Sequence, residues 1–323
     1  MECLNKKILL SIVIPIYKKE RYLKKCIDSL LNVLKGFEDR YEIILVDDGS
    51  PDKCGEICDA YSRQCSNIMT IHKANQGVSA ARNDGVARAR GEYVTFIDAD
   101  DYVTSDMVKV FVALETNPEI NVFQFGYKEV NEYGDEIKTH SYKQNGVLNI
   151  NSNVWRKNAN IPSVCIKIVR KSFLVENEIE FPIGIRNGED WVWTIWICLA
   201  TGNVFVSDVN YYRYLVERET TALMGVSALK DCLDGCKRSY ELIKKYQLPP
   251  KTKKYFKGFI SLQSAFAREY NNSKSKSERR EIRDYCKANK NMMFFPHYKK
   301  IHHKLVWLMC KTIGLRLMSI IPM

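Results

Sequence analysis

The segment EYVTFIDADD, residues 92–101, joins a short apolar run to a cluster of acidic residues. Residues 93–97 are mostly β-branched or aromatic, a composition typical of a buried strand. Asp98, Asp100 and Asp101 follow this strand directly. Carboxylates so close together repel one another, which indicates a bound cation or a structural partner. An aspartate that caps a following helix accounts for one of them but not for the whole cluster.

Upstream of this segment, apolar runs alternate with helical patterns. The expected strands are residues 8–16, 41–46, 68–71 and 93–97, and the expected helices are residues 22–34, 78–89 and a stretch around 57–61. This alternation is typical of βαβ units and predicts an α/β fold with a mostly parallel central sheet flanked by helices. Ligands bind such sheets beyond the carboxyl ends of the strands. Asp47 and Asp48 lie at one of these ends, and the acidic cluster lies at another.

The rest of the chain has a mixed pattern that becomes mostly helical. The expected elements are a hairpin formed by residues 122–130 and 138–142, a helix at 190–200 and a strand at 210–216. After residue 224 the apolar residues recur mainly at helical spacing. We therefore expect a catalytic domain over residues 1–224 and a basic, mostly helical C-terminal region over residues 225–323.

Basic residues are concentrated in this second region. Residues 225–323 contain 22 Lys and Arg against 7 Asp and Glu, a net charge of +15, whereas the whole chain has a net charge of +11. Such asymmetry indicates a polyanionic partner, either an anionic membrane surface or nucleic acid, unless it is only a soluble basic face. The sequence has no helix-turn-helix, zinc-finger or aromatic RNA-binding signature, so we expect no nucleic acid partner.

Apolar residues lie among the lysines of the basic region at 253–259 and 292–309. This mixture suits an interfacial helix on anionic lipid. The alternative is a helical subdomain whose apolar face packs on the catalytic domain. We expect no transmembrane helix, because charges interrupt every long apolar run, and no signal peptide. The expected location is cytoplasmic, peripheral at the inner face of the cell membrane.

The 11 cysteines are odd in number and scattered along the chain. This pattern predicts free thiols in a reducing compartment. Cys54 and Cys58, and likewise Cys232 and Cys236, are spaced as on one face of a helix. Because no second pair or histidine completes a zinc site, we expect them to be buried or surface thiols.

Five motifs within residues 8–220 resemble family 2 of the inverting glycosyltransferases, which have the GT-A (nucleotide-diphospho-sugar transferase) fold. The motifs are SIVIPIY (11–17), VDDGS (46–50), NQGVSAARN (75–83), DADD (98–101) and ED (189–190). Each is weak alone, but they occur in the family's order and at its usual separations. The resemblance implies an enzyme of the bacterial cell-surface polysaccharide type.

The resemblance also implies a nucleotide-sugar site at the carboxyl ends of the strands. The implied donor-binding residues are Pro15, Tyr17, Asp48, Arg82, Asp98 and Ala99. Tyr17 would border the uracil base, Asp48 would accept a hydrogen bond from it, and Asp98 would hold the ribose. Arg82 would place a positive charge near the nucleotide. Asp100 would ligate Mg²⁺ or Mn²⁺, hard cations that are commonly held by carboxylates together with substrate phosphates.

Asp190 matches the general base of the family. In an inverting transfer the acceptor hydroxyl loses its proton as it attacks the anomeric carbon, and one carboxylate within hydrogen-bonding distance suffices for this. The same aspartate can also cap the helix that starts there. His72 is expected to be structural. Arg213 and Arg218 are expected either to contact the diphosphate or to be surface or salt-bridged residues.

These inferences predict a metal-dependent inverting glycosyltransferase. Its donor would be a UDP-sugar, and its acceptor a glycan or glycolipid, with a lipid-linked glycan in cell-surface polysaccharide synthesis as the expected case. The alternative is a non-catalytic nucleotide-sugar-binding protein of the same fold. The presence of both Asp100 and Asp190 favours the enzyme, because a decayed site would have lost at least one of them.

Overall fold

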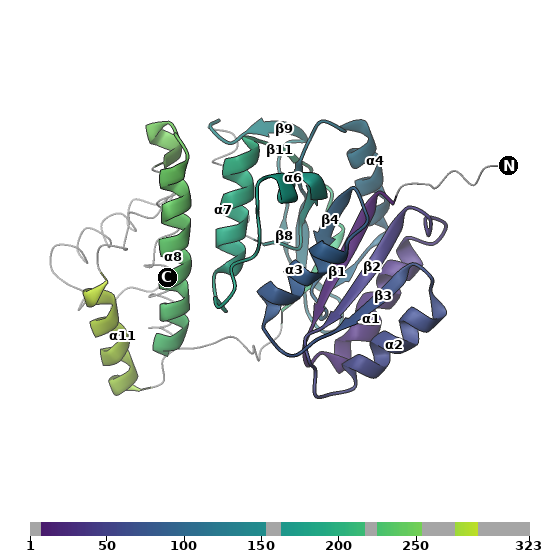
Figure 1. The fold of residues 1–323 in the computed structure, drawn as a ribbon, viewed down its shortest axis with the longest axis horizontal. Coiled ribbons are helices and arrows are strands. Elements are labelled where there is room, and N and C mark those ends of the chain that lie inside the picture. The colour runs from purple at the N-terminus through teal and green to yellow at the C-terminus, as the bar shows by residue number, and fades with distance from the viewer. Residues whose placement is uncertain (1–7, 153–162, 217–224, 254–274, 290–323) are drawn as a thin grey trace. The chain divides into compact units, whose positions relative to one another are not determined.

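The structure, a computed structural model, describes residues 8–152, 163–216, 225–253 and 275–289 (Figure 1). The chain forms two compact units. The first unit comprises residues 1–184 and 197–220, and the second unit comprises residues 185–196 and 221–323. The domain boundary expected at residue 224 stays a prediction.

The first unit is built on an eight-stranded sheet with the order β3-β2-β1-β4-β10-β6-β11-β9. Its first half is parallel. There β1 (Leu10–Ile16) pairs with β2 (Tyr41–Asp47) and β4 (Tyr93–Phe96), and β2 also pairs with β3 (Ile68–His72). Because the strand order reverses beside β1, the carboxyl ends of β1 and β4 form a topological switch point, the usual ligand-binding place in such sheets.

The second half of the sheet mixes strand directions. Its strands are β10 (Lys167–Arg170), β6 (Val122–Gln124), β11 (Asn203–Val206) and β9 (Gly146–Asn149). β10 runs antiparallel to both β4 and β6, and β9 runs antiparallel to β11. The predicted α/β class with a central sheet is confirmed. β10 was absent from the expected elements because charged residues at both its ends interrupt the apolar pattern.

Helices flank this sheet, and the first three along the chain connect its parallel strands (Figure 1). They are α1 (Glu20–Val33), α2 (Cys54–Gln64), α3 (Val78–Arg88), α4 (Val108–Thr116), which follows a 3-10 turn at Ser105–Met107, and α6 (Lys171–Glu176). α2 contacts β2 and β3, and α3 contacts β1 and β2. Every residue of β2 is buried, which explains the nearly continuous apolar runs of these strands.

α3 approaches β1 closely at Gly85. A Cβ atom at this glycine would lie 2.3 Å from Cγ1 of Val13. Ser79, Ala80 and Ala81 on the same helix are also buried. The small residues of the NQGVSAARN motif therefore allow tight packing of a helix on a strand.

A second sheet has the order β5-β12-β7-β8, with β5 (Tyr102–Val103), β12 (Tyr212–Leu215), β7 (Tyr127–Val130) and β8 (Glu136–His140). β7 and β8 form the expected hairpin. The expected strand over residues 122–130 is wrong as a single strand, because it divides at Gly126 into β6 of the first sheet and β7 of the second. A Cβ atom at Gly126 would lie 2.1 Å from Oδ1 of Asn210, so the chain bends where only glycine fits.

The described part of the second unit is helical. It contains the start of α7 (Glu189–Thr201), α8 (Gly225–Lys245) and α11 (Lys276–Ala288). α11 contacts α8, and Ile282 of α11 is buried. The helix expected at 190–200 is confirmed. Residues 254–274 and 290–323, which contain most of the predicted lipid-binding segments, lie outside the described residues. Within the described residues, no helix has the length and apolar character needed to cross a membrane.

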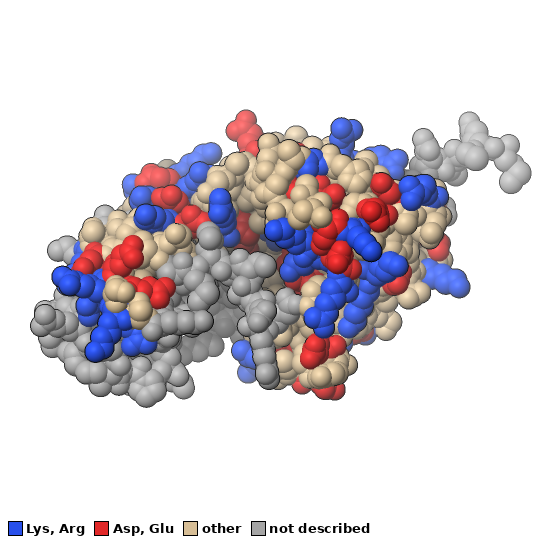
Figure 2. All heavy atoms as spheres, turned by 90° about the horizontal axis from the view of Figure 1, so that it is seen from below, with Lys and Arg blue, Asp and Glu red and all other residues tan. Residues whose placement is uncertain are grey.

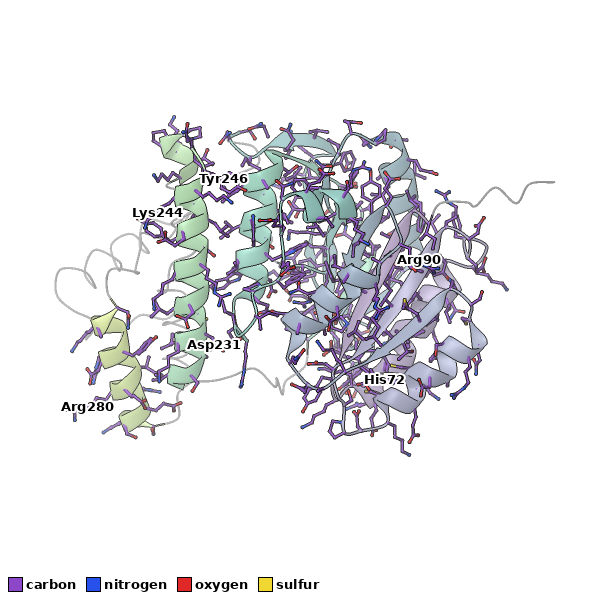
Figure 3. All side chains as sticks on the ribbon, in the orientation of Figure 1. His72, Arg90, Asp231, Lys244, Tyr246 and Arg280 are labelled. Carbon is purple, nitrogen blue, oxygen red and sulfur yellow. The ribbon has the colours of Figure 1, made fainter. Side chains whose placement is uncertain are left out.

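Charged side chains of both signs are interspersed on the face that Figure 2 shows. Several lysines of the second unit lie beside an acidic residue one turn earlier in the same helix. In α8, Lys237 pairs with Asp234 at 3.3 Å and Lys244 pairs with Glu241 at 2.8 Å. Lys244 and Arg280 mark α8 and α11 in Figure 3. The cysteine pairs of α2 and α8 are buried, in agreement with the expectation of thiols, and burial raises the pKa of Cys54 to about 12.

Candidate functional site

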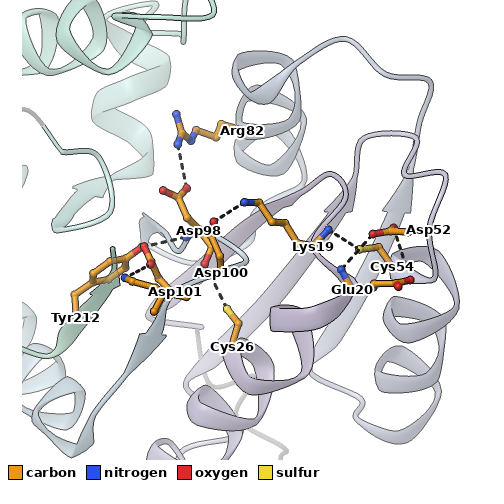
Figure 4. A network of polar contacts seen from close by, with 11 residues as sticks. Lys19, Glu20, Cys26, Asp52, Cys54, Arg82, Asp98, Asp100, Asp101 and Tyr212 are labelled. Carbon is orange, nitrogen blue, oxygen red and sulfur yellow. Dashed lines mark hydrogen bonds and ion pairs between the residues drawn. The ribbon is translucent and has the colours of Figure 1, made fainter. Parts of the chain in front are cut away.

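The loops after β1, β2 and β4 meet at the carboxyl ends of these strands (Figure 4). The backbone N–H of Lys19 donates to Sγ of Cys54 at 3.2 Å, which joins the first loop to the second. The Lys19 side chain reaches Asp100, which joins the first loop to the third. These contacts bring together three loops that are far apart in the sequence and that contain residues the motifs assigned to one site.

Asp98, at the end of β4, is paired with Arg82 of α3. Nη2 of Arg82 lies 3.1 Å from Oδ1 of Asp98, and the guanidinium group lies 5.2 Å from the ring centroid of Phe181. The Arg82 side chain is 5% exposed, whereas that of Asp98 is 33% exposed. Arg82 is therefore fixed behind a carboxylate that still reaches solvent. The neighbouring Ala99 is buried, so at this position a ligand could contact the backbone of the loop but not a side chain.

Asp100 pairs with a lysine that none of the motifs assigned to the site. Nζ of Lys19 lies 2.5 Å from Oδ2 of Asp100, and both side chains are about a quarter exposed, 23% and 25%. This ion pair places a positive charge on the carboxylate expected to hold a metal ion. No local spacing signals the pair, because Lys19 and Asp100 are 81 positions apart.

Asp101 turns away from solvent toward the second sheet. Its carboxylate accepts a hydrogen bond from the hydroxyl of Tyr212 and another from the backbone N–H of Leu215 at 2.7 Å. The same tyrosine hydroxyl accepts a hydrogen bond from the backbone N–H of Asp98 at 3.3 Å. Burial, together with the charges of Asp98 and Asp100, raises the pKa of Asp101 well above its ordinary value. Asp101 and Tyr212 therefore hold the loop in place.

Asp48 ties the loop after β2 to the start of α3. Its two carboxylate oxygens accept hydrogen bonds from the backbone N–H groups of Gln76 and Gly77, at 2.9 and 2.8 Å. The side chain is buried, and its predicted hydrogen bond to a base stays a prediction. The next residue, Gly49, has φ of 70°, and a Cβ atom there would lie 2.9 Å from the backbone nitrogen of Asn75, so the turn requires glycine.

His72 bridges two aspartates beside this loop. Its Nδ1 lies 3.1 Å from Oδ2 of Asp47, and its Nε2 lies 2.9 Å from Oδ1 of Asp59 on α2. Hydrogen bonds to Asp59 and Asp47 raise the pKa of His72, although partial burial opposes this. The arrangement agrees with the structural role expected for this histidine.

Tyr17 and Pro15 lie at the end of β1. Tyr17 is 41% exposed, and the Lys18 ammonium lies 5.2 Å from its ring centroid. Pro15 pairs with Val46 of β2, while the pairing of β1 with β4 ends at Val13. A proline is tolerated in this central strand because no β4 partner requires its missing N–H. The last residues of β1 are thus not paired with β4, which leads to the aspartate cluster, and the exposed Tyr17 follows them.

Asp190 lies in the second unit, in the first turn of α7. It is half-buried, and the preceding Glu189 is buried at 8% exposure. Gly188 has φ of 98° and its carbonyl accepts the backbone N–H of Val192 at 3.2 Å, so the glycine shapes the start of the helix. The role of Asp190 as a base stays a prediction.

The donor set at Asp100 fits a metal ion that substrate phosphates help to hold. Within the part of the chain that the structure describes, no group of three or more His, Cys, Asp or Glu residues is arranged to hold a metal ion. Mg²⁺ is commonly bound by one or two carboxylates plus substrate phosphates, not by a complete protein cage. A single partly exposed carboxylate is compatible with this mode.

Tyr212 and Lys19 are the residues that the sequence patterns did not assign to the site. Tyr212 lies in β12 and is buried beneath the aspartates. In the same strand, Nη1 of Arg213 donates to the carbonyl of Asn210 at 2.7 Å, and its guanidinium group lies 3.7 Å from Glu136. This supports the salt-bridged alternative for Arg213, while Arg218 lies outside the described residues.

Comparison with solved structures shows which proteins share this fold. The chain resembles residues 1–349 of S. aureus TarS in complex with UDP-GlcNAc, with a TM-score of 0.71 and 21% identity, over 88% of this chain and 82% of that chain. The same protein in complex with UDP gives a TM-score of 0.67 at 22% identity, over 84% and 77% of the two chains. The predicted GT-A fold is confirmed.

Sequence relatives lead to the same family. Glycosyltransferase GlyG of Streptococcus pneumoniae is 32% identical over 219 residues, 64% of this chain and 70% of that protein. The poly(ribitol-phosphate) beta-glucosyltransferase of Bacillus spizizenii is 34% identical over 215 residues, 65% of this chain but 32% of that longer protein. The family model described as glycosyl transferase family 2 matches residues 11–176, which include the loops after β1, β2 and β4. With its fold, its relatives and the residues of these loops in agreement, this chain belongs to glycosyl transferase family 2.

Proposed function

We propose that this protein is an inverting glycosyltransferase that moves a sugar from a UDP-sugar to a hydroxyl group of a glycan or glycolipid acceptor in cell-surface polymer synthesis. The observation that supports it most is the meeting of Asp98, Asp100 and Arg82 at the switch point of the sheet. The S. aureus TarS structures with UDP and UDP-GlcNAc, and the polymer named as substrate of the B. spizizenii relative, favour this donor and acceptor class.

In this proposal the first unit binds the donor. The exposed ring of Tyr17 borders the base, and the Asp98 carboxylate accepts hydrogen bonds from the ribose while Arg82 keeps it oriented. Asp48 contributes by shaping the loop before α3, since its oxygens already accept two backbone N–H groups. Preorganised side chains of this kind lower the entropic cost of binding.

Asp100 would hold Mg²⁺ or Mn²⁺ together with the diphosphate. When bound, such an ion supplies Lewis-acid stabilisation of the charge that develops on the departing diphosphate. The remaining step belongs to Asp190, which accepts the proton of the acceptor hydroxyl as that oxygen attacks the anomeric carbon. A single displacement inverts the configuration, so an α-linked UDP-sugar gives a β-linked product.

The test is UDP release from a panel of UDP-sugars, with lipid-linked and free glycan acceptors, in Mn²⁺ or in EDTA. We expect one donor to be turned over by the wild type, with loss of turnover in Asp190→Asn and in Asp100→Ala. Asp208→Asn, which alters an exposed aspartate outside the site, serves as the matched control and is expected to retain turnover.

Three outcomes would contradict parts of the proposal. Donor binding without turnover of any acceptor would favour a non-catalytic nucleotide-sugar-binding protein. Full turnover in EDTA would remove the metal ion from the mechanism. An α-linked product from an α-linked donor, identified by NMR of the anomeric proton, would exclude inversion.

A further inference from the structure

Helix α1 begins in a way that local helix physics disfavours. Its N-cap residue is Lys19, which makes no side-chain capping hydrogen bond. N-cap positions favour side chains that accept hydrogen bonds, and a lysine side chain only donates. A positive charge is also unfavourable near the N-terminal end of a helix dipole. The residue before it, Lys18, has φ of 55°, in the left-handed region. Successive departures from local rules are typical of functional sites.

The partner of Lys19 explains its position. Its ammonium lies 2.5 Å from Oδ2 of Asp100, and Figure 4 shows the side chain extended from the start of α1 toward the aspartate cluster. The backbone around it is anchored: the N–H of Glu20 donates to Asp52 at 3.2 Å, and the N–H of Lys53 donates to Glu20 at 2.9 Å. A fixed backbone thus presents a flexible cationic side chain to the carboxylate.

Each aspartate of the cluster has a different kind of partner. Asp98 faces a guanidinium group that is 5% exposed and packed on an aromatic ring. Asp101 faces a tyrosine hydroxyl and a backbone N–H. Asp100 faces the lysine, whose ammonium is a compact charge on a flexible stem and can change partners. Of these partners, Lys19 is the one suited to move when a ligand arrives.

We propose that Lys19 is a built-in competitor of the divalent metal ion for Asp100. In the donor-free protein its ammonium holds the carboxylate. When a nucleoside diphosphate binds, the ammonium transfers to a phosphate oxygen and Asp100 becomes available to the metal ion. This inference rests on the proposed donor site. It makes metal and diphosphate binding mutually favourable, since each ligand raises the affinity for the other.

The experiment measures Mn²⁺ binding to the full chain by the loss of its free-ion EPR signal, without nucleotide. Lys19→Met is expected to bind Mn²⁺ about tenfold more tightly than the wild type, which corresponds to about 1.4 kcal/mol. Lys19→Arg retains a cation and is expected to stay close to the wild type. Lys18→Met removes the same charge from the adjacent, exposed lysine and is the matched control, expected to leave Mn²⁺ affinity unchanged.

Two further measurements make the result specific. In Lys19→Met/Asp100→Asn the gain in Mn²⁺ affinity is expected to disappear. With UDP present, and after correction for the Mn²⁺–UDP complex in solution, affinity is expected to rise more in the wild type than in Lys19→Met. Circular dichroism of each variant verifies that it is folded.

Equal Mn²⁺ affinity in Lys19→Met and the wild type would overturn the inference, as would a gain that survives Asp100→Asn. An equal effect of UDP on both proteins would overturn the proposed exchange. If the wild type binds no UDP, the proposed donor site is wrong, while the nucleotide-free comparison still decides the role of Lys19.

Discussion

The Tyr212 hydroxyl group joins the second sheet to the aspartate loop, because it donates to Asp101 and accepts from the N–H of Asp98. We predict that Tyr212→Phe lowers the free energy of unfolding by about 1–3 kcal/mol, since it leaves a buried carboxylate with one hydrogen-bond donor fewer. It is also expected to raise the KM for the donor, because the loop that holds Asp98 loses its support. Urea unfolding and donor titration measure the two effects.

Tyr214→Phe is the matched control for this prediction. Tyr214 lies in the same strand and is 45% exposed. Its substitution is expected to change stability by no more than about 0.5 kcal/mol. Equal losses in the two variants would show that the hydrogen bonds of Tyr212 contribute nothing specific.

His72 gives the protein a pH-dependent contribution to stability (Figure 3). Its pKa is raised above the ordinary value of 6.5, so protonated His72 stabilises the folded state fully below pH 6.5 and loses this effect as the pH rises through the raised pKa. The hydrogen bond from His72 lowers the pKa of Asp59 below its ordinary 3.8, so the contribution of Asp59 is lost as the pH falls through that lower pKa.

We therefore predict that His72→Gln is most destabilising between about pH 4 and 6.5 and has little effect at pH 9. Because His72 is 47% exposed, solvent screening keeps the effect small. Thermal unfolding of both proteins across this range measures it. A difference in Tm that stays constant from pH 5 to pH 9 would contradict the prediction.

At the scale of single residues, motifs predicted residues of the candidate site but not the contacts among them. Asp48, Arg82, Asp98 and Asp100 were identified because each belongs to a short motif at the end of a strand or the start of a helix. Tyr212 and Asp101 are separated by 111 positions, so their contact depends on how two sheets are placed and leaves no local pattern. The family resemblance likewise implied a ligand-binding role for Asp48 but not its two hydrogen bonds to backbone N–H groups.

At the scale of elements, Glu42 connects two strands and a loop. Its buried carboxylate accepts hydrogen bonds from Oγ of Ser11 on β1 at 2.7 Å, and from the backbone N–H and Nε of Arg90, which precedes β4, at 2.6 and 2.8 Å. Arg90 is labelled in Figure 3. Burial raises the pKa of Glu42, but these hydrogen bonds outweigh burial and lower the pKa below 4.5.

We predict that Glu42→Gln lowers the free energy of unfolding by about 1–3 kcal/mol at pH 7. Because the pKa is lowered, the carboxylate stabilises the fold above pH 4.5 and the difference between the proteins shrinks as the pH falls through the folded-state pKa. Urea unfolding at pH 7 and pH 4 tests both statements. Glu56→Gln, on the exposed face of α2, is expected to be neutral; a loss as large as that of Glu42→Gln would refute the proposed linkage.

The same scale shows why some elements were predictable and others were not. The parallel strands and their helices follow from local apolar periodicity, and α1 was expected at 22–34 and lies at Glu20–Val33. Residues 122–130 divide between two sheets at Gly126, which approaches Asn210, 84 positions away in the sequence, too closely for a side chain. In the folded chain every residue of β6 is buried, whereas three of the four residues of β7 are only half-buried. Local periodicity does not report this change, because it depends on which strands pair with each segment.

At the scale of the whole molecule, the composition of the basic C-terminal region predicts a membrane partner. Residues 290–323 contain six Lys and Arg and no Asp or Glu, interspersed with apolar residues. Each basic residue near an anionic surface contributes about 1 kcal/mol of attraction. We predict that removal of these residues reduces co-sedimentation with vesicles containing phosphatidylserine by at least about tenfold. We also predict that 0.5 M salt weakens binding of the full chain to these vesicles, because it shortens the electrostatic screening length to on the order of 4 Å.

Vesicles of phosphatidylcholine alone are the control, and neither protein is expected to co-sediment with them. Unchanged co-sedimentation after the truncation would show that residues 290–323 do not bind the protein to the membrane. UDP binding by the truncated protein verifies that its first unit remains folded.

The contact between Gly85 and Val13 limits the order in which this sequence can change over generations. A Cβ atom at Gly85 would lie 2.3 Å from one methyl group of Val13 and 3.0 Å from the other. We thus expect a side chain at Gly85 to be tolerated only after Val13 has been replaced by a smaller residue, and that first step would leave a cavity in the sheet. We therefore expect two positions 72 residues apart to change in a fixed order, with the glycine second.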